Sequence, residues 1–65
     1  MDEASWQEVV DSVRVAGDEL WQLLGRVDFT RDPAAVKFCG ELIRARDELG
    51  RLEGVARERR IEASS

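Results

Sequence analysis

Two heptad repeats of apolar residues, separated by a short polar stretch, constrain the fold of this 65-residue chain more than any other feature. The first repeat advances in steps of four and three residues: Trp6, Val10, Val13, Gly17, Leu20, Leu24 and Val27. A parallel row follows beside it at intervals of seven: Val9, Ala16 and Leu23. This spacing predicts an amphipathic helix over about residues 5–25, with an apolar stripe wide enough for a helical bundle.

The start of this first helix is predicted at Ser5. The stretch "SWQE" fits a capping box, in which the side chains of Ser5 and Glu8 each accept a hydrogen bond from the other residue's backbone N–H. Asp2 and Glu3 place negative charge near the positive end of the helix dipole, which also favours a start here.

The polar stretch between the repeats is expected to reverse the chain. Gly25 can adopt the left-handed conformation that ends many helices, so the first helix should stop close to it. Asp32 followed by Pro33 is a strong start signal, because Asp is a good N-cap and Pro is tolerated at the first helical position. We expect Val27 and Phe29 to fold inward and close the end of the hairpin.

The second repeat predicts a longer helix, over about residues 33–61. Its seam is Ala35, Phe38, Leu42, Ala45, Leu49, Leu52 and Ala56. Two acid-before-base pairs spaced four residues apart support the same helix, Asp47 with Arg51 and Glu53 with Arg57.

Two glycines interrupt the second repeat. Gly50 and Gly54 each cost about 1 kcal/mol inside a helix relative to Ala. If the chain reverses in the middle of the polar stretch, Gly50 lies opposite Val10 and Gly54 opposite Trp6, where the glycines make room for the indole. We favour a continuous, bent helix; the alternative is a break that leaves residues 51–62 as a separate short helix. Because the second helix is the longer one, about two turns at "RERRIE" should overhang.

A chain this short buries little surface and usually needs disulfides, a metal or a partner chain. The single cysteine, Cys39, cannot form a bridge within the chain, and without histidine the ligand set of a structural zinc site is missing. We therefore predict no metal and no cofactor, and expect stability to come from association with another chain. Cys39 is expected to be a reduced, buried thiol.

These observations predict one all-α domain over residues 1–65. It is a hairpin of two antiparallel helices, with a turn at 26–32 and a frayed tail at 62–65, that dimerises into a four-helix bundle. The expected oligomer core consists of large seam residues: Trp6, Val10, Val13, Leu20, Leu24, Phe38, Leu42, Leu49 and Leu52. A second interface is expected at apolar residues outside the seams: Val15, Trp21, Val36 and Ile43.

The net charge of −4 lies entirely within residues 1–27, which carry six acidic and two basic residues. An acidic first half disfavours nucleic-acid binding, which needs a basic surface. The sequence has no apolar run long enough to span a membrane and no basic signal-peptide start. We therefore expect a cytoplasmic protein with no membrane contact.

No catalytic motif emerges from the sequence. With no histidine to activate it, Cys39 is predicted to act as a small hydrophobe rather than as a nucleophile. The paired carboxylates are predicted to lie on solvated helix faces: Asp18 with Glu19, Asp47 with Glu48, and Glu58 with Glu62. A basic cluster near the C-terminus either contacts a partner or forms a solvated helix end: Arg57, Arg59 and Arg60.

The predicted function is a non-enzymatic interaction or regulatory module that self-associates and binds a protein partner. Trp21, at the edge of the acidic first helix, is the expected docking point for a basic partner. In general architecture the chain is similar to the small plasmid RNA-binding helical hairpins that dimerise as four-helix bundles. That likeness of shape keeps a nucleic-acid-binding hairpin dimer open as an alternative. A further alternative is an obligate small subunit of a hetero-oligomer.

An enzyme is the least expected class. Because neither a glycine-rich phosphate loop nor a metal-ligand set is present, only a site between subunits could serve, built from Arg14, Arg44 or Arg46.

Overall fold

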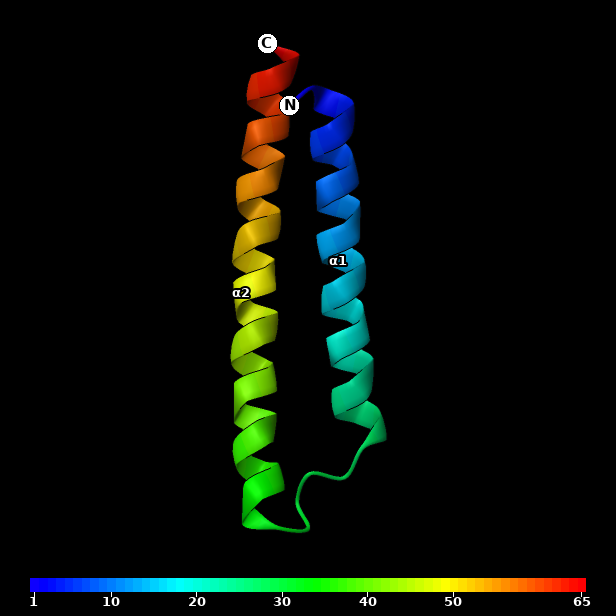
Figure 1. The fold of residues 1–65 in the computed structure, drawn as a ribbon, viewed down its shortest axis with the longest axis vertical. Helices are drawn as coiled ribbons and strands as arrows, with labels where there is room; N and C mark the ends of the chain where they lie inside the picture. The colour runs from blue at the N-terminus through cyan, green and yellow to red at the C-terminus, as the bar shows by residue number, and fades with distance from the viewer.

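The computed structural model describes residues 1–65 as a hairpin of two antiparallel helices, α1 (Glu3–Arg26) and α2 (Pro33–Ser64), with no strand (Figure 1). The molecule is rod-shaped, with principal extents of 51 × 16 × 12 Å. Both termini lie at one end of the rod and the connecting loop at the other (Figure 1). The all-α hairpin predicted from the two heptad repeats is confirmed.

α1 begins before the predicted position. Asp2 is its N-cap, and the Oδ1 atom of Asp2 accepts a hydrogen bond from the backbone N–H of Ser5 at 2.8 Å. The predicted capping box is wrong, because Ser5 and Glu8 both lie inside the helix. Asp2 supplies an equally good cap three residues earlier, so the helix gains additional backbone hydrogen bonds and places Glu3 in its first turn.

α1 ends without a left-handed residue. Val27 is extended, and its backbone N–H donates to the carbonyl of Leu23 at 3.2 Å. No glycine has a positive φ, so the predicted left-handed stop at Gly25 is wrong, and this residue lies in the last turn of the helix. The side chain of Val27 is exposed rather than folded inward, whereas Phe29 is half-buried.

The loop between the helices is held in shape by Asp28. Its Oδ1 atom accepts hydrogen bonds from the hydroxyl and the backbone N–H of Thr30, the latter at 2.9 Å. Its Oδ2 atom lies 3.3 Å from Nε of Arg31. This local turn lets an exposed segment of the chain reverse direction without packing against a core.

α2 begins where the sequence predicts. Asp32 is its N-cap, with Oδ1 accepting from the N–H of Ala35 at 2.9 Å, and Pro33 is the first helical residue. The helix continues through Gly50 and Gly54 without interruption. Of the two alternatives for this segment, the continuous helix is confirmed.

The two helices pair in a register that the sequence did not predict. Three cross-helix contacts define it: Gln7 with Arg60, Arg14 with Glu53, and Trp21 with Arg46. The residue numbers of the two partners add up to 67 in each pair. This sum is larger than the one expected if the chain reversed in the middle of the loop. The offset arises because the loop continues beyond the end of α1 before it joins α2, so α2 extends past α1 at the loop end (Figure 1).

Two predictions that depended on the register are therefore wrong. The overhanging turns lie at the start of α2 and not at "RERRIE", where Arg60 donates a hydrogen bond to Gln7. A Cβ atom at Gly50 or Gly54 would meet no other group within 4 Å, so neither glycine makes room for the ring of Trp6.

The seam of α2 is rotated relative to the prediction. The inner side of α2 has heptad spacing. Six of its residues face α1: Leu42, Arg46, Leu49, Glu53, Ala56 and Arg60. Ala35 and Cys39 continue the same rows in the turns that extend past α1. Three residues predicted for this seam are exposed beside it: Phe38, Ala45 and Leu52. The polar residues can occupy the seam because their aliphatic stems pack between the helices while their charged ends reach polar partners on α1.

The core of a single hairpin is very small. Only Val10 and Ala56 are buried, at 1% and 2% exposure, and the other seam residues are at best half-buried. Cys39 is a free, half-buried thiol in the row that faces α1. Neither helix combines the length and the apolar character that crossing a membrane requires.

Candidate interaction surfaces

One side of the hairpin, which we call the polar side, carries all the cross-helix polar contacts. Glu53 pairs with two guanidinium groups there: its Oε1 atom lies 3.5 Å from Nε of Arg14, and its Oε2 atom lies 3.1 Å from Nη2 of Arg57. Farther toward the termini, Arg60 donates a hydrogen bond to the side-chain oxygen of Gln7. These contacts connect the helices at two levels and help to fix their register.

An aromatic contact continues the polar side toward the loop. The guanidinium carbon of Arg46 lies 4.6 Å from the centre of the Trp21 ring, within the range of a cation–π interaction. The ring is nevertheless 61% exposed. Arg46 therefore restrains the position of an aromatic side chain that remains open to solvent.

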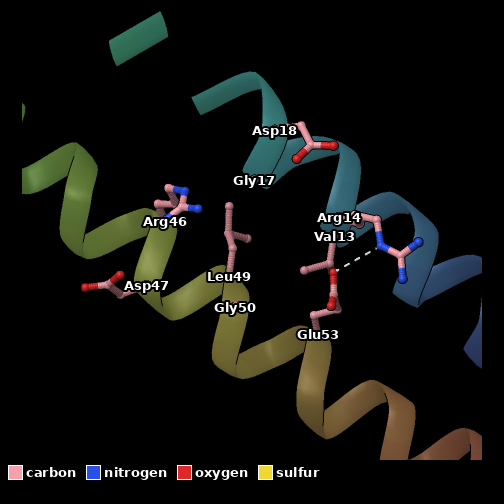
Figure 2. Close-up of a pocket in the computed structure, with 9 residues that line it drawn as sticks. All are labelled: Val13, Arg14, Gly17, Asp18, Arg46, Asp47, Leu49, Gly50 and Glu53. Atoms are coloured by element: carbon pink, nitrogen blue, oxygen red, sulfur yellow. Dashed lines mark ion pairs between the residues drawn. The ribbon is translucent and has the colours of Figure 1, made fainter. Parts of the chain in front are cut away.

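A hollow of about 270 Å³ lies on the polar side between these two sets of contacts (Figure 2). Val13 and Leu49 point into the space between the helices and form its floor, whereas Asp47 points away from α1 (Figure 2). The hollow is open because two glycines line it and a Cβ at either would meet nothing within 4 Å: Gly17 and Gly50. It is a surface depression between helices that still has an apolar floor.

The opposite side of the hairpin carries small and apolar side chains in its two innermost rows as far as Leu52, where the α2 row ends because its next position is Arg59. In α1 the row containing Ala16 lies across the seam from Arg14, and in α2 the row containing Ala45 lies across the seam from Glu53. Both rows are therefore on the side away from the ion pairs. We call this surface the apolar face: Val9, Ala16 and Leu23 of α1, with Phe38, Ala45 and Leu52 of α2.

The apolar face is only partly covered in one hairpin. Phe38 is 52% exposed and Leu52 is 39% exposed, and Ala45 is exposed between them. The neighbouring residues Leu42 and Leu49 lie in the seam between the helices and are half-buried. An exposed surface of this kind on a small protein is typical of a protein–protein interface.

A third surface, the acidic face, is the side of α1 that points away from α2. Its residues are all exposed and, after the first, lie three or four positions after an earlier member of the set: Glu8, Asp11, Val15, Asp18 and Glu19. None of its four carboxylates takes part in an ion pair; the ion pairs of the chain use Asp28, Glu48, Glu53 and Glu62. The side-chain amide of Gln7 donates to Oδ1 of Asp11 at 2.9 Å.

The basic cluster near the C-terminus is engaged within the chain. Arg57 pairs with Glu53, Arg59 lies 3.1 Å from Glu62, and Arg60 donates to Gln7. These guanidinium groups therefore do not form a free cationic patch.

One predicted helix pair is present and the other is replaced. The pair of Glu53 with Arg57 forms as expected. Arg51 pairs with Glu48 instead of Asp47, because the i, i+3 geometry lets its guanidinium donate from both Nε and Nη2. This contact lowers the pKa of Glu48 and raises the pKa of Arg51. All the paired carboxylates named from the sequence lie exposed, as predicted.

The structure divides the predicted second-interface residues between two surfaces. Trp21, Val36 and Ile43 lie on the polar side, since the row of Val36 and Ile43 borders the row of Arg46. Val15 lies apart from them, at the centre of the acidic face. These four residues therefore do not form one patch.

The apolar face itself was only partly recognised from the sequence. The row of Val9, Ala16 and Leu23 was seen, but the sequence placed Phe38 and Leu52 in the seam of α2. The charged residues at every seventh position, Arg46, Glu53 and Arg60, could have given the signal. A repeat of charged residues beside an apolar row can mark a polar contact line between helices.

Five ion pairs lie on the surface of the hairpin, and one of them, Arg14 with Glu53, joins the two helices. Comparison with protein-family models, curated proteins and solved structures finds no match to this chain.

Proposed function

We propose that this chain is a non-enzymatic interaction module that self-associates through its apolar face and binds a protein partner on its outer surface. Two hairpins would pack with their apolar faces together to form a four-helix bundle. The observation that supports this most directly is the size of the core, since a single hairpin buries only Val10 and Ala56.

Energetics favour covering the apolar face. Burying a Leu or Phe side chain completely contributes roughly 1.5–3 kcal/mol, and Phe38 and Leu52 remain 52% and 39% exposed in one copy. A standard interface covers about 800 Å² per partner, which is about a sixth of the 4942 Å² surface of this chain. The face consists of two rows of residues, each about 21 Å long at the helical rise of about 1.5 Å per residue, on a rod of 51 Å.

The shape of the face also suits a second copy. In the observed register Ala16 lies level with Leu52, and Leu23 lies level with Ala45. At each of these two levels the face therefore has one large and one small side chain. A second copy related by a two-fold axis can place its leucines over these alanines, as isologous packing requires.

A protein partner is favoured over nucleic acid. Nucleic-acid binding needs free basic groups, whereas Arg57, Arg59 and Arg60 already hold acceptors within the chain. We place the protein in the cytoplasm, where a lone thiol such as Cys39 stays reduced.

The proposal is tested by sedimentation equilibrium of two matched variants. Leu52→Asp places a charge on the apolar face, while Ile61→Asp places the same charge at an exposed apolar residue on the other side of α2. We expect Leu52→Asp to weaken self-association at least about tenfold and Ile61→Asp to change it by less than about twofold. Equal behaviour of the two variants would rule out the apolar face as the interface.

The main alternative is that the apolar face is covered by a different chain. In that case the isolated wild-type chain stays monomeric and loses helicity, because no second hairpin completes its core.

A further inference from the structure

Within the hairpin, the acidic face of α1 takes part in a single side-chain hydrogen bond, from the amide of Gln7 to Asp11. Its central residue, Val15, is 56% exposed and lies on the opposite side of the helix from Val10, which is 1% exposed. Packing through the apolar face would leave the acidic face open, because the row of Val9 and Ala16 is on another side of the helix.

The carboxylates of this face are not neutralised from within the chain. Glu8, Asp11, Asp18 and Glu19 form no ion pair. The one basic residue between them in sequence, Arg14, directs its guanidinium to Glu53 on α2. A concentrated negative field therefore remains over the part of α1 from Glu8 to Glu19.

Trp21 adds an apolar anchor at the edge of this field. It follows Asp18 by one turn, is 61% exposed and is held in place by Arg46 at 4.6 Å. An aromatic side chain that is already restrained loses little entropy on binding, and tryptophan is enriched among residues that dominate binding energy.

We infer that the acidic face, with Trp21 at its edge, binds a basic amphipathic helix from a partner protein. Lysine or arginine side chains of that helix pair with the carboxylates of α1, and its apolar residues pack on Val15 and against Trp21. The stretch from Glu8 to Trp21 is about 20 Å long at the helical rise of about 1.5 Å per residue, which matches a partner helix of about 14 residues.

Charge complementarity selects this class of partner. Nucleic acids and anionic membrane surfaces carry the same sign of charge as the acidic face and are repelled by it. The inference rests on the proposed function only in that the bundle leaves this face open.

The test uses a synthetic peptide of about 15 residues in which lysine and leucine alternate in an amphipathic helical pattern. The protein carries Trp6→Phe, so that the fluorescence reports Trp21 alone. We expect the peptide to shift the Trp21 emission to shorter wavelength, with an affinity that falls as salt is raised. The same peptide with glutamate in place of lysine should not bind.

Two double variants locate the binding surface. Asp11→Asn with Asp18→Asn removes two charges from the acidic face, and Glu41→Gln with Glu58→Gln removes two unpaired charges from exposed positions of α2. We expect the first to weaken peptide binding about tenfold and the second by less than about twofold.

Mass measurements on the same samples separate this inference from the proposed function. A dimer that shows no emission shift, or that binds equally in both double variants, would overturn the acidic face as the docking site and leave self-association intact. A protein that is monomeric in the absence of peptide would contradict self-association whatever the peptide does.

Discussion

At the scale of single residues, the glycines of α2 are unusual because nothing in one hairpin needs them. Gly50 and Gly54 have ordinary helical φ values, and a Cβ at either would meet no other group within 4 Å. Each therefore lowers helix stability without permitting a close approach between α1 and α2.

Replacing one of these glycines should stabilise the protein. We expect Gly54→Ala to raise the free energy of unfolding by roughly 0.5–1 kcal/mol, because alanine restricts the unfolded chain and fits the open space. Thermal unfolding followed by circular dichroism should show a midpoint several degrees higher. Glu58→Ala is the control: glutamate and alanine have similar helix propensities, so this substitution should change the midpoint much less. A lower midpoint would mean that another chain occupies the space beside Gly54.

The N-cap of α2 makes a second prediction at this scale. Asp32→Ala removes the acceptor for the N–H of Ala35, so the free energy of unfolding should fall by about 1 kcal/mol. Asp32→Ser keeps a capping oxygen and should lose much less. If urea unfolding gives the same loss for both variants, the hydrogen bond to Ala35 is not what starts α2.

At the scale of the elements, the N-terminus of α1 and the loop that follows this helix both depend on ionised carboxylates. Hydrogen bonds from Ser5 hold the pKa of Asp2 below its usual value, and the hydroxyl and N–H of Thr30 do the same for the pKa of Asp28. Because these folded-state pKa values are depressed, the unfolded chain binds more protons on acidification. The stabilisation is therefore complete above about pH 4 and is lost as the pH falls through the folded-state pKa values.

This linkage can be measured as the change in thermal midpoint between about pH 5 and pH 3. The midpoint should fall on acidification in the wild type and fall less in the double variant Asp2→Asn with Asp28→Asn, since amides do not titrate. Asp18→Asn is the matched control, because that carboxylate accepts no hydrogen bond within the chain. A double variant as acid-sensitive as the control would show that these two carboxylates do not couple folding to pH.

The sequence predicts the elements better than it predicts how they meet. The two heptad repeats, the start signal Asp32–Pro33 and the continuity of α2 could all be predicted, because helical periodicity and capping are local properties. The choice of Asp2 over Ser5 as N-cap could not, since both are good caps and only the extra backbone hydrogen bonds decide between them.

The register and the seam of α2 depend on interactions between the helices. Apolar periodicity alone favours Phe38 over Cys39 as a seam residue, because the row of Phe38 continues with Ala45 and Leu52 whereas the row of Cys39 continues with charged residues. The structure uses the row that brings Glu53 beside Arg14 and leaves Phe38 outside. Sequence reasoning fails here because it assigns the inner row by hydrophobicity, whereas polar contacts help to select it.

At the scale of the whole molecule, one hairpin has too little interior for independent stability. A 65-residue chain buries a small fraction of its surface even when globular, and this one is a rod with two buried residues. The sequence predicts that the molecule has apolar and acidic surfaces. It does not predict how these surfaces are divided into the polar side, the apolar face and the acidic face, because the register of the two helices decides which rows of residues border the ion pairs.

The central claim is that a second copy completes the core, and the solution mass of the wild-type chain tests it most directly. Light scattering over a wide concentration range, with circular dichroism on the same samples, should give a helical species of about twice the 7.4 kDa chain mass. Dilution should reduce mass and helicity together, because the hairpin loses its packing when it loses its partner. A species of 7.4 kDa that keeps its full helicity across the range would contradict the claim.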